Sequence, residues 1–144
     1  MTNKNVEEAA VMIIVRDRKI LSISRRDDIS VFGLIGGKKD LSDDSLMATA
    51  IRETKEETSV IVKKCIEVYT RMEPPRYPGG LSFNTTCFYA TEWEGEPKDS
   101  DEGKVKWLTR SELSNPPPVG VGAFALYNTY ALNVLSNQFK IELL

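Results

Sequence analysis

The segment from about Asp43 to Thr58 constrains the fold most, because it predicts a helix with two different sides. With a turn of about 100° per residue, the side that we expect to pack on a core gathers Leu46, Met47, Ala50, Ile51 and Thr54. The glutamates Glu53, Glu56 and Glu57 crowd into an arc of roughly 100° that borders this side. The helix must therefore rest on a hydrophobic layer while a row of carboxylates stays at its rim.

This acidic arc contains no cation, because Lys55 and Arg52 project outside it on a helical projection. Glu53 and Glu57 form a like-charged i,i+4 pair, which costs an isolated helix about 0.2–0.5 kcal/mol. A hard divalent cation that takes oxygen ligands and bridges to phosphates would favour such a pair. The alternative interpretation is a solvated acidic face, which is common in glutamate-rich helices.

Two adjacent glycines, Gly36 and Gly37, follow an apolar strand end and precede the expected helix. Ser42 is the N-cap that we expect, with Asp43 and Asp44 at the positive end of the helix dipole. Glycines of this kind allow the backbone to approach a metal or a phosphate closely. A plain strand-to-helix turn is the other interpretation of the same residues, and both can hold at once.

An EF-hand calcium loop is a competing metal motif, because residues 40–44 resemble its start. The match fails further on, where Ser45 occupies the place of the turn glycine and Ile51 that of the bidentate glutamate.

The remaining pattern predicts an α/β (α+β) fold in which helices cover a mixed β-sheet. A second helix should run from about Val121 to Leu135, after the stiff connector at 115–118, and Pro74 to Gly80 should form a loop. We expect strands at Ala10–Val15, Ile20–Ser24, Val31–Ile35, Val60–Met72, Leu81–Thr91 and Lys104–Leu108. With 144 residues, we expect one domain over 1–144.

Charge and composition exclude several classes of function. The net charge is −2 with 28% charged residues, so long nucleic acids are not expected partners. The first residues do not resemble a signal peptide and no apolar run is long enough to cross a bilayer, so we expect a cytoplasmic protein without membrane contact. Cys65 and Cys87 are expected to be buried thiols. The chain has no histidine, so acid–base chemistry would depend on carboxylates, lysine, tyrosine or a metal and its water.

The residues from Gly37 to Val60 resemble the signature of the Nudix hydrolases. That signature is glycine, five residues, glutamate, seven residues, then Arg-Glu-aliphatic-any-Glu-Glu-any-Gly-aliphatic. The matching residues are Gly37, Arg52, Glu53, Glu56, Glu57 and Val60. Three departures stand out: Asp44 in the place of the first glutamate, a spacing from Gly37 that is one residue longer, and Ser59 in the place of the last glycine.

The resemblance implies the Nudix α/β/α sandwich and the hydrolysis of a phosphoanhydride in a nucleoside diphosphate linked to another group. It implies Mg²⁺, or Mn²⁺, as the cofactor. Glu53 would be the general base, and Arg52 would orient one of the signature glutamates. The implied metal ligands are Glu53, Glu56 and Glu57, together with Glu102 and the carbonyl of Gly37.

Two further segments extend the resemblance to about residues 6 to 113. The stretch around Trp93 and Trp107 is similar to the part of MutT-type enzymes that delivers another acidic ligand. Glu102 is the residue that we assign there, and Asp101 is its rival. Arg26 matches an arginine that faces the phosphates of the substrate, and the loop with Arg76 and Tyr77 should contact the variable part of the substrate.

Two hypotheses about function follow. The first is an active pyrophosphohydrolase for a nucleoside or deoxynucleoside triphosphate, acting as a monomer or a homodimer. The second is a Nudix-like sensor that holds a nucleotide without cleaving it, suggested by the departures at Asp44 and Ser59 and in the spacing.

Overall fold

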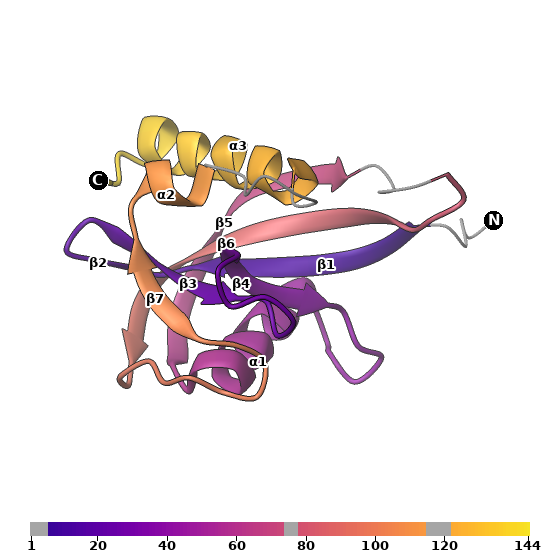
Figure 1. The fold of residues 1–144 in the computed structure, drawn as a ribbon, viewed down its shortest axis with the longest axis horizontal. Helices are drawn as coiled ribbons and strands as arrows, with labels where there is room; N and C mark the ends of the chain where they lie inside the picture. The colour runs from indigo at the N-terminus through magenta and orange to yellow at the C-terminus, as the bar shows by residue number, and fades with distance from the viewer. Residues whose placement is uncertain (1–5, 74–77, 115–121) are drawn as a thin grey trace.

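The computed structural model describes residues 6–73, 78–114 and 122–144, which form a β-sheet with helices on both sides (Figure 1). The strands are β1 (Val6–Ile13), β2 (Val15–Arg16), β3 (Lys19–Ser24), β4 (Phe32–Lys38), β5 (Ile61–Glu73), β6 (Ser82–Glu94) and β7 (Val105–Leu108). The helices are α1 (Leu46–Thr58), α2 (Arg110–Ser114) and α3 (Gly122–Gln138).

The sheet is mixed, as the sequence predicts. Its strand order is β2-β3-β4-β1-β6-β5, and β7 also pairs with β3, outside this order. The pair β1 and β6 is parallel, with Val11 opposite Cys87, whereas the other pairs are antiparallel. Helix α1 covers one face, and α2 with α3 covers the other (Figure 1). The predicted α/β/α arrangement is confirmed.

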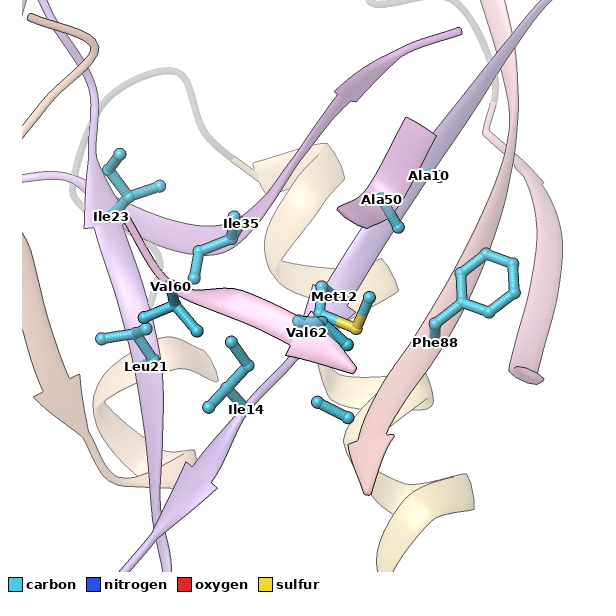
Figure 2. Packing of buried hydrophobic residues seen from close by; sticks show 11 residues of the cluster. Ala10, Met12, Ile14, Leu21, Ile23, Ile35, Ala50, Val60, Val62 and Phe88 are labelled. Atoms are coloured by element: carbon cyan, nitrogen blue, oxygen red, sulfur yellow. The ribbon is translucent and has the colours of Figure 1, made fainter. Parts of the chain in front are cut away.

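Each face of the sheet has its own hydrophobic core. On the α1 side, Figure 2 shows a cluster of buried side chains from β1, β3, β4, β5 and β6 together with Ala50 of α1. On the α3 side, the sheet residues Ile13, Ile20 and Cys87 meet the buried stripe of α3, which consists of Tyr127, Ala131, Leu132 and Leu135. The sheet separates these two cores. The side of α1 that carries Glu53, Glu56 and Glu57 borders the core on the α1 side.

Helix α1 begins three residues later than the predicted start at Asp43. The hydroxyl of Ser45 accepts a hydrogen bond from the backbone N–H of Ala48 at 3.0 Å, so Ser45 and not Ser42 is the N-cap. The prediction that Met47 packs on the core is also wrong, since it is 40% exposed, whereas Thr49 is buried. The later start leaves Asp43 in the preceding turn.

Other boundaries differ by a few residues, and one element was not predicted. Strand β1 occupies Val6–Ile13 instead of Ala10–Val15, and β4 extends through both glycines to Lys38. The short helix α2 has five residues, too few to show a helical pattern of apolar positions. Both cysteines are free thiols; Cys87 is buried and Cys65 only partly so. Within the described ranges, no helix combines the length and apolar character that a membrane span requires.

Candidate active site

Helix α1 presents its three glutamates at different depths. Glu57 is buried, the side chain of Glu53 is 18% exposed, and that of Glu56 is 56% exposed. The helix ends at Ser59, whose backbone is left-handed with φ 70° and whose N–H donates to the Lys55 carbonyl at 2.9 Å. The signature glycine that Ser59 replaces is the residue that usually adopts this conformation. The helix therefore ends at the position of the signature glycine, although this chain has Ser59 there.

Glu57 is a buried carboxyl group with one hydrogen bond from the neighbouring strand. Its Oε2 accepts from the backbone N–H of Gly36 at 3.2 Å. Burial raises the pKa of Glu57 to about 8, and the charge of Glu53 adds to the rise, while the Gly36 hydrogen bond opposes it. An ionised Glu57 therefore needs a positive partner.

Glu53 lies directly against Gly37, the last glycine of β4. A Cβ atom added to Gly37 would be 2.5 Å from the carboxyl carbon of Glu53 and 2.6 and 2.9 Å from its two oxygens. Only glycine allows this contact between strand and carboxylate. Burial raises the pKa of Glu53 as well, opposed by the charge of Arg52. The sequence predicted that a metal or a phosphate could approach the backbone closely at the glycines. In the structure, the group that lies close to Gly37 is the side chain of Glu53.

The prediction that the acidic arc contains no cation is wrong. Nη1 of Arg52 donates to Oε1 of Glu53 at 3.0 Å and to Oε2 of Glu56 at 3.2 Å. A helical projection places Arg52 outside the arc, but its long side chain reaches back across the surface of the helix. Arg52 thus orients two signature glutamates, whereas the sequence assigned it one.

Asp43, and not Asp44, takes the place of the first acidic residue of the signature. Its two carboxylate oxygens accept from Nε and Nη2 of Arg52, both at 2.8 Å, and Oδ2 also accepts from Thr49 Oγ1 at 2.9 Å and from Asp40 N at 3.0 Å. The Arg52 guanidinium holds the pKa of Asp43 well below its usual range. Asp44 is exposed.

This assignment moves the additional residue of the signature. Five residues separate Gly37 from Asp43, as the signature requires, and eight instead of seven separate Asp43 from Arg52. The additional residue therefore falls between Asp43 and Arg52, in the stretch that contains the N-cap Ser45 and the start of α1. The spacer that follows the glycines is regular.

Glu102 and Arg26 meet beside the acidic residues of α1. Nη2 of Arg26 donates to Oε1 of Glu102 at 3.0 Å, and Nε of Arg26 donates to the carbonyl of Asp101 at 3.1 Å. The charge of Glu102 contributes to the raised pKa of both Glu53 and Glu57. Two segments far apart in sequence, the end of β3 and the turn before β7, thus bring one arginine and one glutamate to the rim of α1.

The residues around Glu57 fit a hard divalent cation. Two desolvated carboxylates of like charge lie beside a glycine strand, and their donor atoms are oxygens, as Mg²⁺ and Mn²⁺ prefer. In the part of the chain that the structure describes, no three acidic, histidine or cysteine side chains already converge as a metal site. Arg52 holds Glu53 and Glu56, and Arg26 holds Glu102, in the arrangement seen. The other predicted substrate residues, Arg76 and Tyr77, lie outside the described residues.

The comparisons with known proteins identify the family and the fold. The model of the NUDIX domain matches residues 6–130. None of the curated proteins matches the sequence. Among solved structures, the MutT NUDIX hydrolase from Burkholderia pseudomallei is similar with a TM-score of 0.71 and 22% identity, over 92% of this chain and 99% of that chain. The MutT protein from Bacillus halodurans has a TM-score of 0.68 and 26% identity, over 87% and 82%. The NUDIX domain of Shewanella oneidensis NrtR, solved in complex with ADP ribose, has a TM-score of 0.67 and 21% identity, over 92% and 88%.

Proposed function

Because the chain belongs to the NUDIX domain family, whose members hydrolyse phosphoanhydride bonds in derivatives of nucleoside diphosphates, we propose that it is a Mg²⁺-dependent nucleotide pyrophosphohydrolase. The substrate in this proposal is a nucleoside or deoxynucleoside triphosphate. A cytoplasmic location belongs to the same proposal, because these substrates are made and used there.

One observation carries the proposal: Glu53 and Glu57 are held together beside a double glycine, in a place where neither carboxylate is well solvated. Ionising both groups there is costly unless a cation binds them. Catalysis of phosphoryl transfer depends mainly on positioning the reacting groups and on neutralising the charge of the phosphates. A cation bound between these carboxylates would do both.

The roles that we propose for the residues are those implied by the resemblance to the family signature. The carboxylates of Glu53, Glu56, Glu57 and Glu102, with the carbonyl of Gly37, would hold the cation. When bound, a divalent cation supplies charge neutralisation on the polyphosphate and lowers the pKa of water. Arg26, together with Arg76 and Tyr77, would contact the substrate.

Glu53 is the residue that we propose as the general base. Its carboxylate is only 18% exposed and is fixed between Gly37 and Arg52, and a positioned carboxylate is a common general base. Arg52 supports this role by orienting Glu53 through a 3.0 Å hydrogen bond, while Asp43 holds Arg52 from the other side.

A substrate panel tests the proposal. We expect release of phosphate products with Mg²⁺ from at least one member of a panel of nucleoside and deoxynucleoside triphosphates, ADP-ribose, dinucleoside polyphosphates and capped RNA. Glu53→Gln should lower that rate by at least about 10²-fold. Glu92→Gln is the matched control, because Glu92 is an exposed glutamate on β6 whose side chain is paired with Lys64. It should keep the wild-type rate.

The alternative function is a sensor that binds a nucleotide without cleaving it. The departures from the signature suggested it, but two of them have a local explanation. Asp43 provides the carboxylate for Arg52 at the regular spacing from Gly37, and Ser59 adopts the left-handed backbone of the missing glycine. Equal and negligible hydrolysis by the wild type and Glu53→Gln, with tight binding of one nucleotide, would favour the sensor.

A further inference from the structure

The contact between Arg26 and Glu102 joins two residues that the proposed function assigns to different partners. The proposed function places Arg26 on the phosphates and Glu102 on the cation. In the structure the two side chains instead bind each other, with Nη2 of Arg26 at 3.0 Å from Oε1 of Glu102. The ion pair occupies Nη2 of Arg26 and one oxygen of Glu102, so it competes with both proposed roles.

The backbone of the turn that carries Glu102 is held firmly against the end of β3. The N–H of Ser24 donates to the carbonyl of Lys104 at 2.8 Å, and the hydroxyl of Ser24 accepts from the N–H of Lys104 at 2.9 Å. A Cβ added to Gly103 would be 2.3 Å from the carbonyl oxygen of Ser24. The turn is also closed by paired hydrogen bonds between Ser100 and Gly103, at 3.0 and 3.2 Å. Movement of the Glu102 carboxylate therefore requires rotation of its side chain and not movement of the loop.

We propose that Arg26 is a positioning residue, which holds the Glu102 carboxylate away from the cation site until a polyphosphate takes over its guanidinium. The inference rests on the proposed function. The charge of Glu102 acts on both Glu53 and Glu57, so Glu102 lies on the same side of the molecule as the proposed cation site.

The exchange of partners is favourable on physical grounds. The side chains of Arg26 and Glu102 are 68% and 53% exposed, and exposed ion pairs are weak. A polyphosphate carries several charges and accepts two parallel hydrogen bonds from one guanidinium, so it competes well for Arg26. Nucleotide binding would then free Glu102 for the cation, and each ligand would tighten the binding of the other.

Binding of Mn²⁺ without nucleotide tests the inference. Electron paramagnetic resonance reports free Mn²⁺, so a dissociation constant can be measured without any hydrolysis. Arg26→Ala should bind Mn²⁺ about two- to fivefold more tightly than the wild type, because an exposed pair stores no more than this. In the background Glu102→Gln, the same substitution at Arg26 should have no effect.

Two variants separate positioning from net charge. Arg25→Ala removes an equal charge one residue away, and Arg25 is paired with Asp27 and not with Glu102. Its dissociation constant for Mn²⁺ should stay at the wild-type value. Arg26→Lys keeps the charge but loses the two-point contact with the Asp101 carbonyl and Glu102, so it should lie between the wild type and Arg26→Ala.

A non-hydrolysable triphosphate analogue gives the second measurement. In the wild type it should tighten Mn²⁺ binding by a larger factor than in Arg26→Ala, where Glu102 is already free. Equal effects of Arg25→Ala and Arg26→Ala, or weaker Mn²⁺ binding by Arg26→Ala, would overturn the inference. A wild type that hydrolyses a nucleotide while failing in this way leaves the proposed function intact; a wild type that binds no Mn²⁺ and cleaves nothing overturns both.

Discussion

The buried carboxyl of Glu57 should make the metal-free protein less stable as the pH rises. Burial raises its pKa to about 8 in the folded chain, from an ordinary value of 4.5. Between these values the unfolded chain ionises the group and the folded chain does not, so the free energy of unfolding falls as the pH increases. The contribution of Glu57 is complete below about pH 4.5 and is lost by about pH 8.

The magnitude follows from the size of this window. From the ordinary value of 4.5 to pH 7 is about 2.5 units, and about 1.4 kcal/mol per unit gives about 3–4 kcal/mol at pH 7. Glu57→Gln replaces the carboxyl with a neutral group of the same shape, whose oxygen can still accept from the N–H of Gly36. The variant should therefore exceed the wild type in stability by up to about 3–4 kcal/mol at pH 7 and match it at pH 4.

Urea unfolding in the presence of a chelator, at pH values from 4 to 9, measures the effect. Glu56→Gln is the control, because it removes a carboxylate at the exposed end of the same cluster and should stay within about 0.5 kcal/mol of the wild type. Saturating Mn²⁺ should reverse the order, since the wild type gains the free energy of metal binding. Parallel stability curves for the wild type and Glu57→Gln across this range would refute the argument from burial.

Three further substitutions test other parts of the site. Ser59→Gly should raise the free energy of unfolding by about 1 kcal/mol, because a left-handed backbone costs a residue with a side chain about that much; a melting temperature that does not rise would contradict this. Gly37→Ala should lower hydrolysis at least about tenfold in a folded protein, because the added Cβ displaces Glu53. The control Gly33→Ala, on the same strand with no atom within 4 Å of the added Cβ, should keep the wild-type rate, and equal losses in both would refute the prediction. Asp43→Asn should be less stable than the wild type at neutral pH and should approach it as the pH falls below about 4. The lowered pKa of Asp43 means that its ionised form stabilises the fold, and protonation removes this stabilisation. Urea unfolding across this pH range measures the difference, and a difference that stays constant would count against the prediction.

The parts of the site that depend on local pattern could be predicted from the sequence. The spacing of Glu53, Glu56 and Glu57 places them on one side of a helix whatever surrounds it, and the double glycine signals a close approach of the backbone. The core strands were also predicted, because continuous apolar runs need a buried sheet. These inferences use only contacts within one element or its immediate neighbour.

The partner of Arg52 could not be predicted in the same way. Asp40, Asp43 and Asp44 all precede α1 within a few residues, and only the path of the turn decides which carboxylate faces Arg52. The start of the helix had the same ambiguity, since both Ser42 and Ser45 can cap it. The pair of Arg26 and Glu102 joins positions 76 residues apart, which no local pattern reveals.

The two cores on opposite faces of the sheet divide the molecule into halves that can change independently. Substitutions beneath α3 alter the packing of Tyr127, Leu132 and Leu135, whereas the carboxylates of α1 rest on the other face. Randomised libraries confined to the α3 half should therefore yield variants that still bind divalent ions normally. Natural divergence could follow the same route, diversifying one half while the other is inherited unchanged.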